Sequence, residues 1–435
     1  MKAILDLIAR HKSGEPCGLY SVCSAHPLVI EATFFHAKRA GAPFALVEAT
    51  SNQVNQDGGY TGMKPADFRD FVFRIADRAG FARDRILLGG DHLGPNAWQA
   101  MPAEAAMARA EVLIADYVAA GFRKIHLDCS MSCADDPTPL PDETVARRAA
   151  RLCAVAERSH AQAGYAQAGG ERPVYVIGTE VPVPGGAAEE LGTLAVTTPD
   201  AARATIDVHR TVFGGAGLAD AWPRVIAVVV QPGVEFDHRK VVPYVPANAR
   251  ALSGMIEDYD SLIFEAHSTD YQTPAALAAL VRDHFAILKV GPGVTFALRE
   301  ALWGLDAIER EWMRDRASGF RDIVMARMRT EPRHWAKYYH ARGADLDYDL
   351  QYSLSDRIRY YWPDPEISRA LETMFANLAH SPPPPALVSQ YLPIAHAAVR
   401  DGLIGGSPAE LAMAHVWAVL DGYHRAVSGG KGSAS

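Results

Sequence analysis

Ionisable and amide side chains stand directly after short apolar runs along most of the chain. Asp91 and His92 close the run that starts at Ile86, and Glu265 and His267 lie in the run that starts at Leu262. Eight such runs occur, and the polar residues that close or follow seven of them are Asn52, Asp91 with His92, Asp128, Glu180, Gln231, Glu265 with His267, and Lys289. One acid in such a place is usually a structural group, but this repetition predicts a single functional rim.

The histidines and carboxylates of this set could bind a metal ion. His92, His267 and Glu180 offer imidazole and carboxylate donors, which suit zinc and, after it, manganese, and three ligands leave positions open for substrate. One divalent ion would act there as a Lewis acid on a ketose. Asp91 adjoins His92 on the opposite strand face, so one of them can bind the metal while the other serves as acid or base. Asp128 and Glu180 are further candidates for the acid or base. The alternative is that the histidines only form hydrogen bonds at the rim.

Lys289 interrupts an apolar run, and two catalytic roles are open to it. A lysine at the end of a barrel strand can form a Schiff base with a ketose. It can also remain an ammonium that pairs with Glu265 or with the substrate, and this is the role that we expect.

Two segments are candidates for phosphate binding. Gly291-Pro-Gly293-Val-Thr295 follows the last apolar run and precedes a helix, so its backbone N–H groups could hold a phosphate. Arg357 and Arg359 add guanidinium groups, which suit phosphate oxygens, although the same residues could instead dock the C-terminal part. The predicted substrate-binding set is Asn52, Gln231, Glu265, Gly291, Gly293, Ser355, Arg357 and Arg359.

The eight apolar runs predict an α/β fold, a (β/α)₈ TIM barrel. They lie at 18–23, 44–50, 86–92, 124–130, 174–180, 225–231, 262–268 and 285–291. Parallel strands buried on both faces form continuous apolar runs, and helix-like stretches separate these ones. Eight repeats favour a closed barrel over an open doubly wound sheet, and no Gly-x-Gly-x-x-Gly follows the first run.

The length of 435 residues exceeds the roughly 250 of a plain barrel. We expect the barrel over residues 1–315 and a C-terminal helical extension over 316–427, packed on the barrel mouth. Residues 428–435 are rich in glycine and serine and predict a flexible tail.

Composition narrows the partners and the compartment. The formal net charge is −8 and no basic run stands out, which argues against nucleic acid. No apolar stretch approaches the roughly 20 residues of a membrane helix, and the first residues do not resemble a signal peptide. Five scattered cysteines predict reduced thiols, so we expect a cytoplasmic protein.

Several longer motifs make the chain resemble the GatZ/KbaZ family, whose members are known as the second subunit of class II tagatose-1,6-bisphosphate aldolase. The motifs include Leu88-Gly-Gly-Asp-His-Leu-Gly-Pro-Asn96 and Glu265-Ala-His-Ser-Thr-Asp-Tyr-Gln272. The others lie at 18–27, 48–63, 124–131, 178–182, 229–236, 289–292 and 352–362. The resemblance implies a barrel fold and a tagatose or fructose phosphate context. The Asp91-His92 pair is similar to the acid/base aspartate and metal histidine of class II aldolases.

Two functions remain open at this point. One is a metal-dependent 4-epimerase that interconverts tagatose and fructose, as their 6-phosphates, by retro-aldol and aldol steps or by proton transfer. The other is a non-catalytic accessory subunit that stabilises a separate aldolase. The expected partners are a ketose or ketose phosphate, a second copy of the chain, or an aldolase subunit. A rim with a complete catalytic set favours the enzyme.

Overall fold

A closed barrel of eight parallel strands forms the core of the computed structural model, which describes residues 1–164, 170–182, 186–187 and 194–429. The predicted TIM barrel is thus confirmed, and the open sheet is excluded. The strands are β1 (Leu19–Cys23), β2 (Ala45–Thr50), β3 (Ile86–Leu93), β4 (Lys124–Leu127), β5 (Val174–Ile177), β6 (Val225–Val230), β9 (Ile263–Ala266) and β10 (Ile287–Val290). Around the barrel their order is β1-β10-β9-β6-β5-β4-β3-β2.

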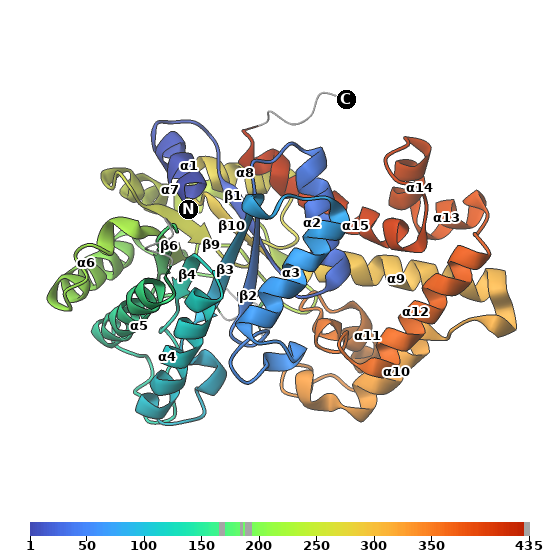
Figure 1. Ribbon diagram of the computed structural model, residues 1–435, viewed down its shortest axis with the longest axis horizontal. Helices are drawn as coiled ribbons and strands as arrows, with labels where there is room; N and C mark the ends of the chain where they lie inside the picture. The colour runs from blue at the N-terminus through green and yellow to red at the C-terminus, as the bar shows by residue number, and fades with distance from the viewer. Residues whose placement is uncertain (165–169, 183–185, 188–193, 430–435) are drawn as a thin grey trace.

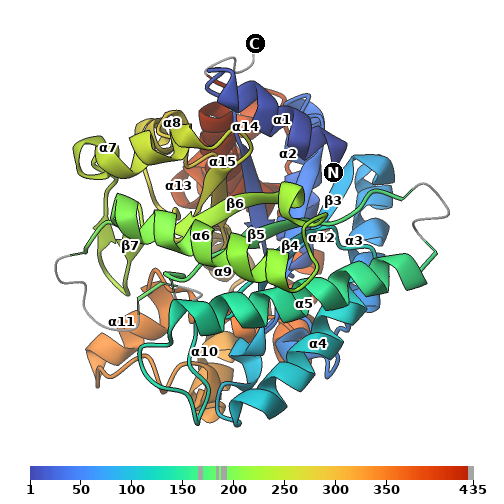
Figure 2. The ribbon, with the colours of Figure 1, turned by 90° about the vertical axis from the view of Figure 1, so that its left-hand side faces the viewer.

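Seven helices follow the first seven barrel strands and cover the outer wall (Figure 2). They are α2 (Pro27–Arg39), α3 (Pro65–Ala79), α4 (Ala103–Ala119), α5 (Asp142–Gln162), α6 (Pro199–Gly215), α7 (Pro246–Met255) and α8 (Pro274–Arg282). Several begin at a proline, which fits the first helical turn because it needs no N–H donor there. Thr198 and Thr273 cap α6 and α8 by accepting backbone hydrogen bonds.

The N-terminal helix α1 (Lys2–Lys12) closes one end of the barrel. Its buried residues Ile4, Leu7 and Ile8 belong to an apolar cluster with strand residues such as Leu19 and Leu46. This end is therefore sealed by hydrophobic packing, and the polar strand ends lie at the opposite end.

The C-terminal part begins with α9 (Pro292–Met313), which follows β10 and reaches away from the barrel (Figure 1). The helices of the extension are α10 (Phe320–Thr330), α11 (Ala344–Tyr352), α12 (Pro365–His380), α13 (Pro385–Tyr391) and α14 (Pro393–Arg400). The last helix, α15 (Pro408–Val427), returns and packs against α2, α8 and α9, where an eighth barrel helix belongs. We propose to count α15 with the barrel and to keep residue 316 as the start of the extension.

A short antiparallel hairpin, β7 (Glu235–Phe236) with β8 (Val241–Val242), follows β6 and was not expected from the sequence. Of the predicted tail, all residues after Gly429 lie outside the described part of the chain. No helix within the described ranges is long and apolar enough to cross a membrane.

Candidate active site

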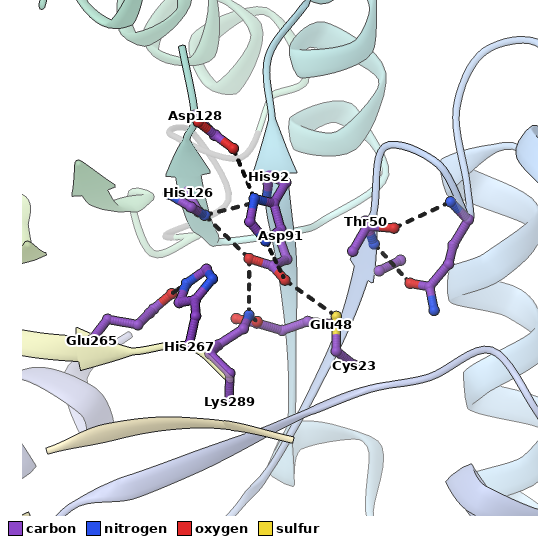
Figure 3. Close-up of polar contacts among 12 residues, drawn as sticks. Cys23, Glu48, Thr50, Asp91, His92, His126, Asp128, Glu265, His267 and Lys289 are labelled. Carbon is purple, nitrogen blue, oxygen red and sulfur yellow. Dashed lines mark hydrogen bonds and ion pairs between the residues drawn. The ribbon is translucent and has the colours of Figure 1, made fainter. Parts of the chain in front are cut away.

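A layer of paired charges fills the barrel interior near the strand ends. Glu48 from β2, Lys124 from β4 and Glu265 from β9 have no exposed surface. Lys124 Nζ lies 2.8 Å from Glu48 Oε1 and 2.6 Å from Glu265 Oε2. Lys289 from β10 contacts the other oxygen of Glu48, and its Nζ lies 3.0 Å from Asp91 Oδ1 (Figure 3). Each ammonium thus bridges two carboxylates, which offsets the cost of burying the charges.

Three histidine rings face one another beside this layer (Figure 3). The ring centroids of His92 and His267 lie 4.9 Å apart, and that of His126 lies 5.2 Å from each. Asp128 Oδ2 lies 2.7 Å from Nδ1 of His92, which leaves Nε2 of this ring facing the cluster. A carboxylate on one ring nitrogen is a common device for orienting an imidazole toward a metal.

The donor atoms fit one divalent cation. One atom each of Asp91, His126, Glu265 and His267 lies within 4.8 Å of the others, and Nε2 of His126 has no hydrogen-bond partner among the described residues. Four buried carboxylates face two ammonium groups, which leaves two formal negative charges when the imidazoles are neutral. The carboxylates are Glu48, Asp91, Asp128 and Glu265, and the ammonium groups are Lys124 and Lys289. A divalent ion would balance this excess.

A cavity opens onto these groups. Asp91, His92, His267 and Lys289 line it, and Arg359 reaches it from the C-terminal extension. A second, larger cavity of about 400 Å³ shares Arg359 with it. The polar groups at the barrel mouth are therefore reachable by a small molecule, and the extension forms part of the wall.

Electrostatics keep Asp91 ionised. Burial by itself would raise the pKa of Asp91, but His92, when protonated, and the ammonium of Lys289 hold it well below its ordinary value. Cys23 donates a weak hydrogen bond from Sγ to Asp91 Oδ2 over 3.4 Å. Burial opposes the charge on Lys289 as well, yet Asp91 and Glu48 hold the pKa of Lys289 well above its ordinary value. The pair thus exists as carboxylate and ammonium, so Lys289 is not a neutral amine ready for imine formation.

Comparison with known proteins identifies the family. The model of the "D-tagatose-1,6-bisphosphate aldolase subunit GatZ/KbaZ-like" family matches residues 4–428. The chain belongs to the GatZ/KbaZ-like family. A crystal structure described as a probable tagatose 6 phosphate kinase from Sinorhizobium meliloti 1021 is 51% identical over 94% of this chain and 100% of that one, with a TM-score of 0.85. The glycerol-complexed fructuronate-tagaturonate epimerase from Cohnella laeviribosi shares the fold at 13% identity, over 96% and 82% of the chains, with a TM-score of 0.50.

Most of the predicted catalytic rim of this GatZ/KbaZ-like chain comes together. The six residues that meet in the buried cluster are Asp91, His92, Asp128, Glu265, His267 and Lys289. Asn52 lines the cavity, as its predicted substrate role requires. Glu265 is fully buried against Lys124 and His267 and does not line the cavity. It therefore positions these two side chains and does not contact a molecule in the cavity.

Glu180 and Gln231 lie in other surroundings. Glu180 is exposed, and its carboxylate accepts a hydrogen bond from Thr197 over 2.6 Å, so it is not among the clustered donors of the described chain. Gln231 Oε1 accepts the backbone N–H groups of Gly233 and Val234 at 2.8 and 3.0 Å. Gln231 therefore shapes the turn after β6. Glu180 therefore does not join the histidines of the expected metal set, because its exposed carboxylate accepts from Thr197 instead.

The amides predicted to hold phosphate already have a partner. The backbone N–H groups of Gly291 and Gly293 donate to Asp270 Oδ1 at 2.9 and 2.7 Å. A side chain from the loop after β9 thus takes the place that a phosphate oxygen was expected to occupy.

The predicted residues of the extension divide between two roles. Arg359 lines both cavities. Arg357 instead lies over the ring of Tyr338, with Cζ 3.4 Å from the centroid, and its Nε donates to the carbonyl of His334. Ser355 Oγ lies 3.2 Å from the hydroxyl of Tyr339. Arg357 therefore packs within the extension, and Ser355, whose Oγ also lies 3.3 Å from Nδ1 of His238, docks the extension onto the β7–β8 hairpin. Neither residue lines the cavity.

Sequence reasoning missed several residues near the site, and four of them show why. His126 stands two residues before Asp128, and this period of two on a strand is a signal that could have found it. Cys23 ends β1 and could have been found by its place at the rim. Asp270 lies in the loop after β9 and Glu235 in the short hairpin strand β7, and only the structure reveals their contacts.

Glu235 provides a test of burial at this end of the barrel. Burial raises its pKa from 4.5 to about 7, although hydrogen bonds from Phe236 and Ser268 oppose the shift. Because the folded protein holds this proton more tightly, the stabilising contribution is complete below about pH 4.5 and disappears as the pH rises through about 7. We expect Glu235→Gln to gain about 3 kcal/mol of unfolding free energy, relative to the unsubstituted protein, between pH 4.5 and 8.

Denaturant titration of both proteins at several pH values measures this difference, and other titrating groups cancel between them. A constant difference across the range would contradict the assignment to Glu235.

Proposed function

We propose that the protein is a divalent-metal-dependent 4-epimerase that interconverts tagatose and fructose, as their 6-phosphates. The observation that carries the proposal is the cavity lined by Asp91, His92, His267 and Lys289. It joins an ionised carboxylate, an ammonium and metal donors on one wall. Contact with another subunit requires no such set at the bottom of a cavity.

The proposed metal ligands are His126 and His267 of the donor cluster, together with His92, which lies outside that cluster but turns Nε2 toward it. Imidazole nitrogens suit zinc, so we expect zinc ahead of manganese. A divalent ion bound there supplies Lewis acidity toward the ketose C2 oxygen. Asp128 orients His92 through Nδ1, and Glu265 Oε1 lies 2.9 Å from Nε2 of His267.

The chemistry must invert C4, a carbon that does not adjoin the C2 carbonyl. In the proposed route Asp91 takes the proton of the C4 hydroxyl, C4 becomes an aldehyde carbon, and the C3–C4 bond breaks. The electron pair of that bond passes to C3 and onto the C2 oxygen. The aldehyde then turns about its C4–C5 bond, C3 attacks its other face, and Asp91 returns the proton to O4.

Asp91 is the base that this cavity leaves available. The other carboxylate among the described lining residues is Asp270, whose Oδ1 already accepts two backbone hydrogen bonds. One base suffices for bond cleavage and re-formation, whereas proton transfer along the chain needs bases at several carbons. Lys289, 3.0 Å from Asp91 Oδ1, holds the carboxylate in place.

The test uses the purified chain alone. It is treated with a chelator, dialysed, and incubated with tagatose 6-phosphate after addition of zinc, manganese or no metal. We expect fructose 6-phosphate to form with metal only, and ¹³C-labelled dihydroxyacetone to enter the ketose because C3–C4 cleavage releases that fragment. Absence of conversion in the zinc- and manganese-loaded samples would refute the epimerase.

An accessory subunit is the second candidate, and the family description, which names an aldolase subunit, favours it. It predicts that the chain alone is inactive and that it raises the activity or stability of a co-purified aldolase subunit. The same preparation, assayed with and without that subunit on tagatose 1,6-bisphosphate, separates the two candidates.

A further inference from the structure

One buried carboxylate joins the loops that follow β9 and β10. Asp270 is 3% exposed, and its Oδ1 accepts hydrogen bonds from Gly291 N at 2.9 Å and Gly293 N at 2.7 Å. Barrels commonly bind phosphate with the loops after the last two strands and the helix start that follows. Here a side chain of the protein occupies those donors, and Asp270 also lines the cavity.

The identity of residue 293 makes this contact possible. A Cβ placed on Gly293 would lie 2.9 Å from Asp270 Oδ1, closer than such atoms approach. Glycine therefore lets the carboxylate come close enough to bind both amides. The occupation of these two amides by a side chain therefore depends on having glycine at 293 and aspartate at 270.

A second carboxylate lies at the same helix start. Asp356, 3% exposed, accepts a hydrogen bond from Thr295 Oγ1 over 2.5 Å, within the first turn of α9. Two acids thus face the N-terminal end of α9 and offset the partial positive charge of its dipole. A phosphate at this position would be repelled by the two carboxylates, and the amides of Gly291 and Gly293 would not be free to bind it.

One positively charged side chain in the cavity wall, Arg359, is not paired with a carboxylate in the described chain and can bind an anionic group. Among its described lining residues the cations are Lys289 and Arg359, and Lys289 is already bridged by Glu48 and Asp91. Arg359 donates hydrogen bonds to the carbonyl of Ser355 and, over 3.0 Å each, to the carbonyl of Asp356 and the hydroxyl of Tyr360, but it pairs with no carboxylate in the described chain. The charge of Arg359 can therefore neutralise one phosphate group of a bound sugar, but not two.

We propose that Asp270 is a specificity-determining residue that keeps a second phosphate out of the site. The site accepts ketose monophosphates, with the phosphate at Arg359 and a neutral hydroxymethyl group beside Asp270, and it refuses ketose 1,6-bisphosphates. The proposal rests on the proposed function for the ketose itself.

Binding to the metal-loaded chain tests this without turnover. Isothermal titration calorimetry compares fructose 6-phosphate with fructose 1,6-bisphosphate on the unsubstituted chain, Asp270→Ser and Asp270→Asn. We expect the unsubstituted chain to bind the 6-phosphate at least about tenfold tighter than the bisphosphate. Asp270→Ser frees the two amides and should gain at least about tenfold for the bisphosphate, with the 6-phosphate little changed. Asp270→Asn keeps an acceptor oxygen on both amides and should gain less than about threefold, which separates occupancy from charge.

Equal binding of both sugars by the unsubstituted chain would overturn the inference, whatever the variants do. So would an Asp270→Ser protein that binds the 6-phosphate normally and gains nothing for the bisphosphate. Failure of every ketose phosphate to bind would instead count against the proposed function, from which this proposal takes its substrate.

Discussion

Replacing Asp91 by asparagine is expected to lower kcat for tagatose 6-phosphate by about two to four orders of magnitude. The amide keeps the shape of the side chain and its place between Lys289 and His126, from which Asp91 Oδ1 lies 3.0 and 3.1 Å. It cannot accept the C4 hydroxyl proton at neutral pH, so the C3–C4 bond has no route to cleavage. Steady-state kinetics with the zinc-loaded protein measure the loss.

Metal content decides whether Asp91 acts as base or as ligand. If Asp91 acts as a base and not as a ligand, the Asp91→Asn protein should retain near-stoichiometric zinc, measured by elemental analysis. The matched control is Asp128→Asn, which removes the carboxylate that holds His92 and should weaken metal binding about 10- to 100-fold. If Asp91→Asn also loses its zinc, Asp91 is a ligand and the assigned base is wrong.

The second large effect concerns the phosphate. Arg359→Met is expected to raise KM for fructose 6-phosphate about ten- to a hundredfold, because a charge-assisted contact is worth about 1.5–3 kcal/mol. Free fructose has no phosphate, so its KM should change little. The guanidinium is well placed for this role, because Arg359 lines the cavity beside Tyr360 and Arg357 does not.

The chain offers a matched control two residues away. Arg357→Met removes the same charge from a side chain that lies over Tyr338 and binds the carbonyl of His334. We expect it to lower the thermal unfolding temperature without changing the ratio of the two KM values. A loss that is equal on both sugars in Arg359→Met would mean that Arg359, too, only docks the extension.

Much of the fold is readable from local chemistry. Prolines at 199, 274 and 408 begin helices, because the first helical position needs no N–H donor and the ring favours its backbone angle. The eight apolar runs predict eight buried strands, and each strand of the barrel lies within or across the run expected for it. Since parallel strands end at one rim, the placing of Asp91, His92, His267 and Lys289 in one cavity also follows from the sequence.

The sequence alone left the partners of these residues undecided. The pairing of Asp270 with the amides of Gly291 and Gly293 depends on two loops that meet only when β9 and β10 lie side by side. Periodicity can place a side chain on a strand face, but which groups touch depends on register between strands and on the paths of loops. The same reason separates Arg359 from Arg357, which are alike in sequence: the packing of the extension against the barrel brings one of them to the cavity and leaves the other among tyrosines.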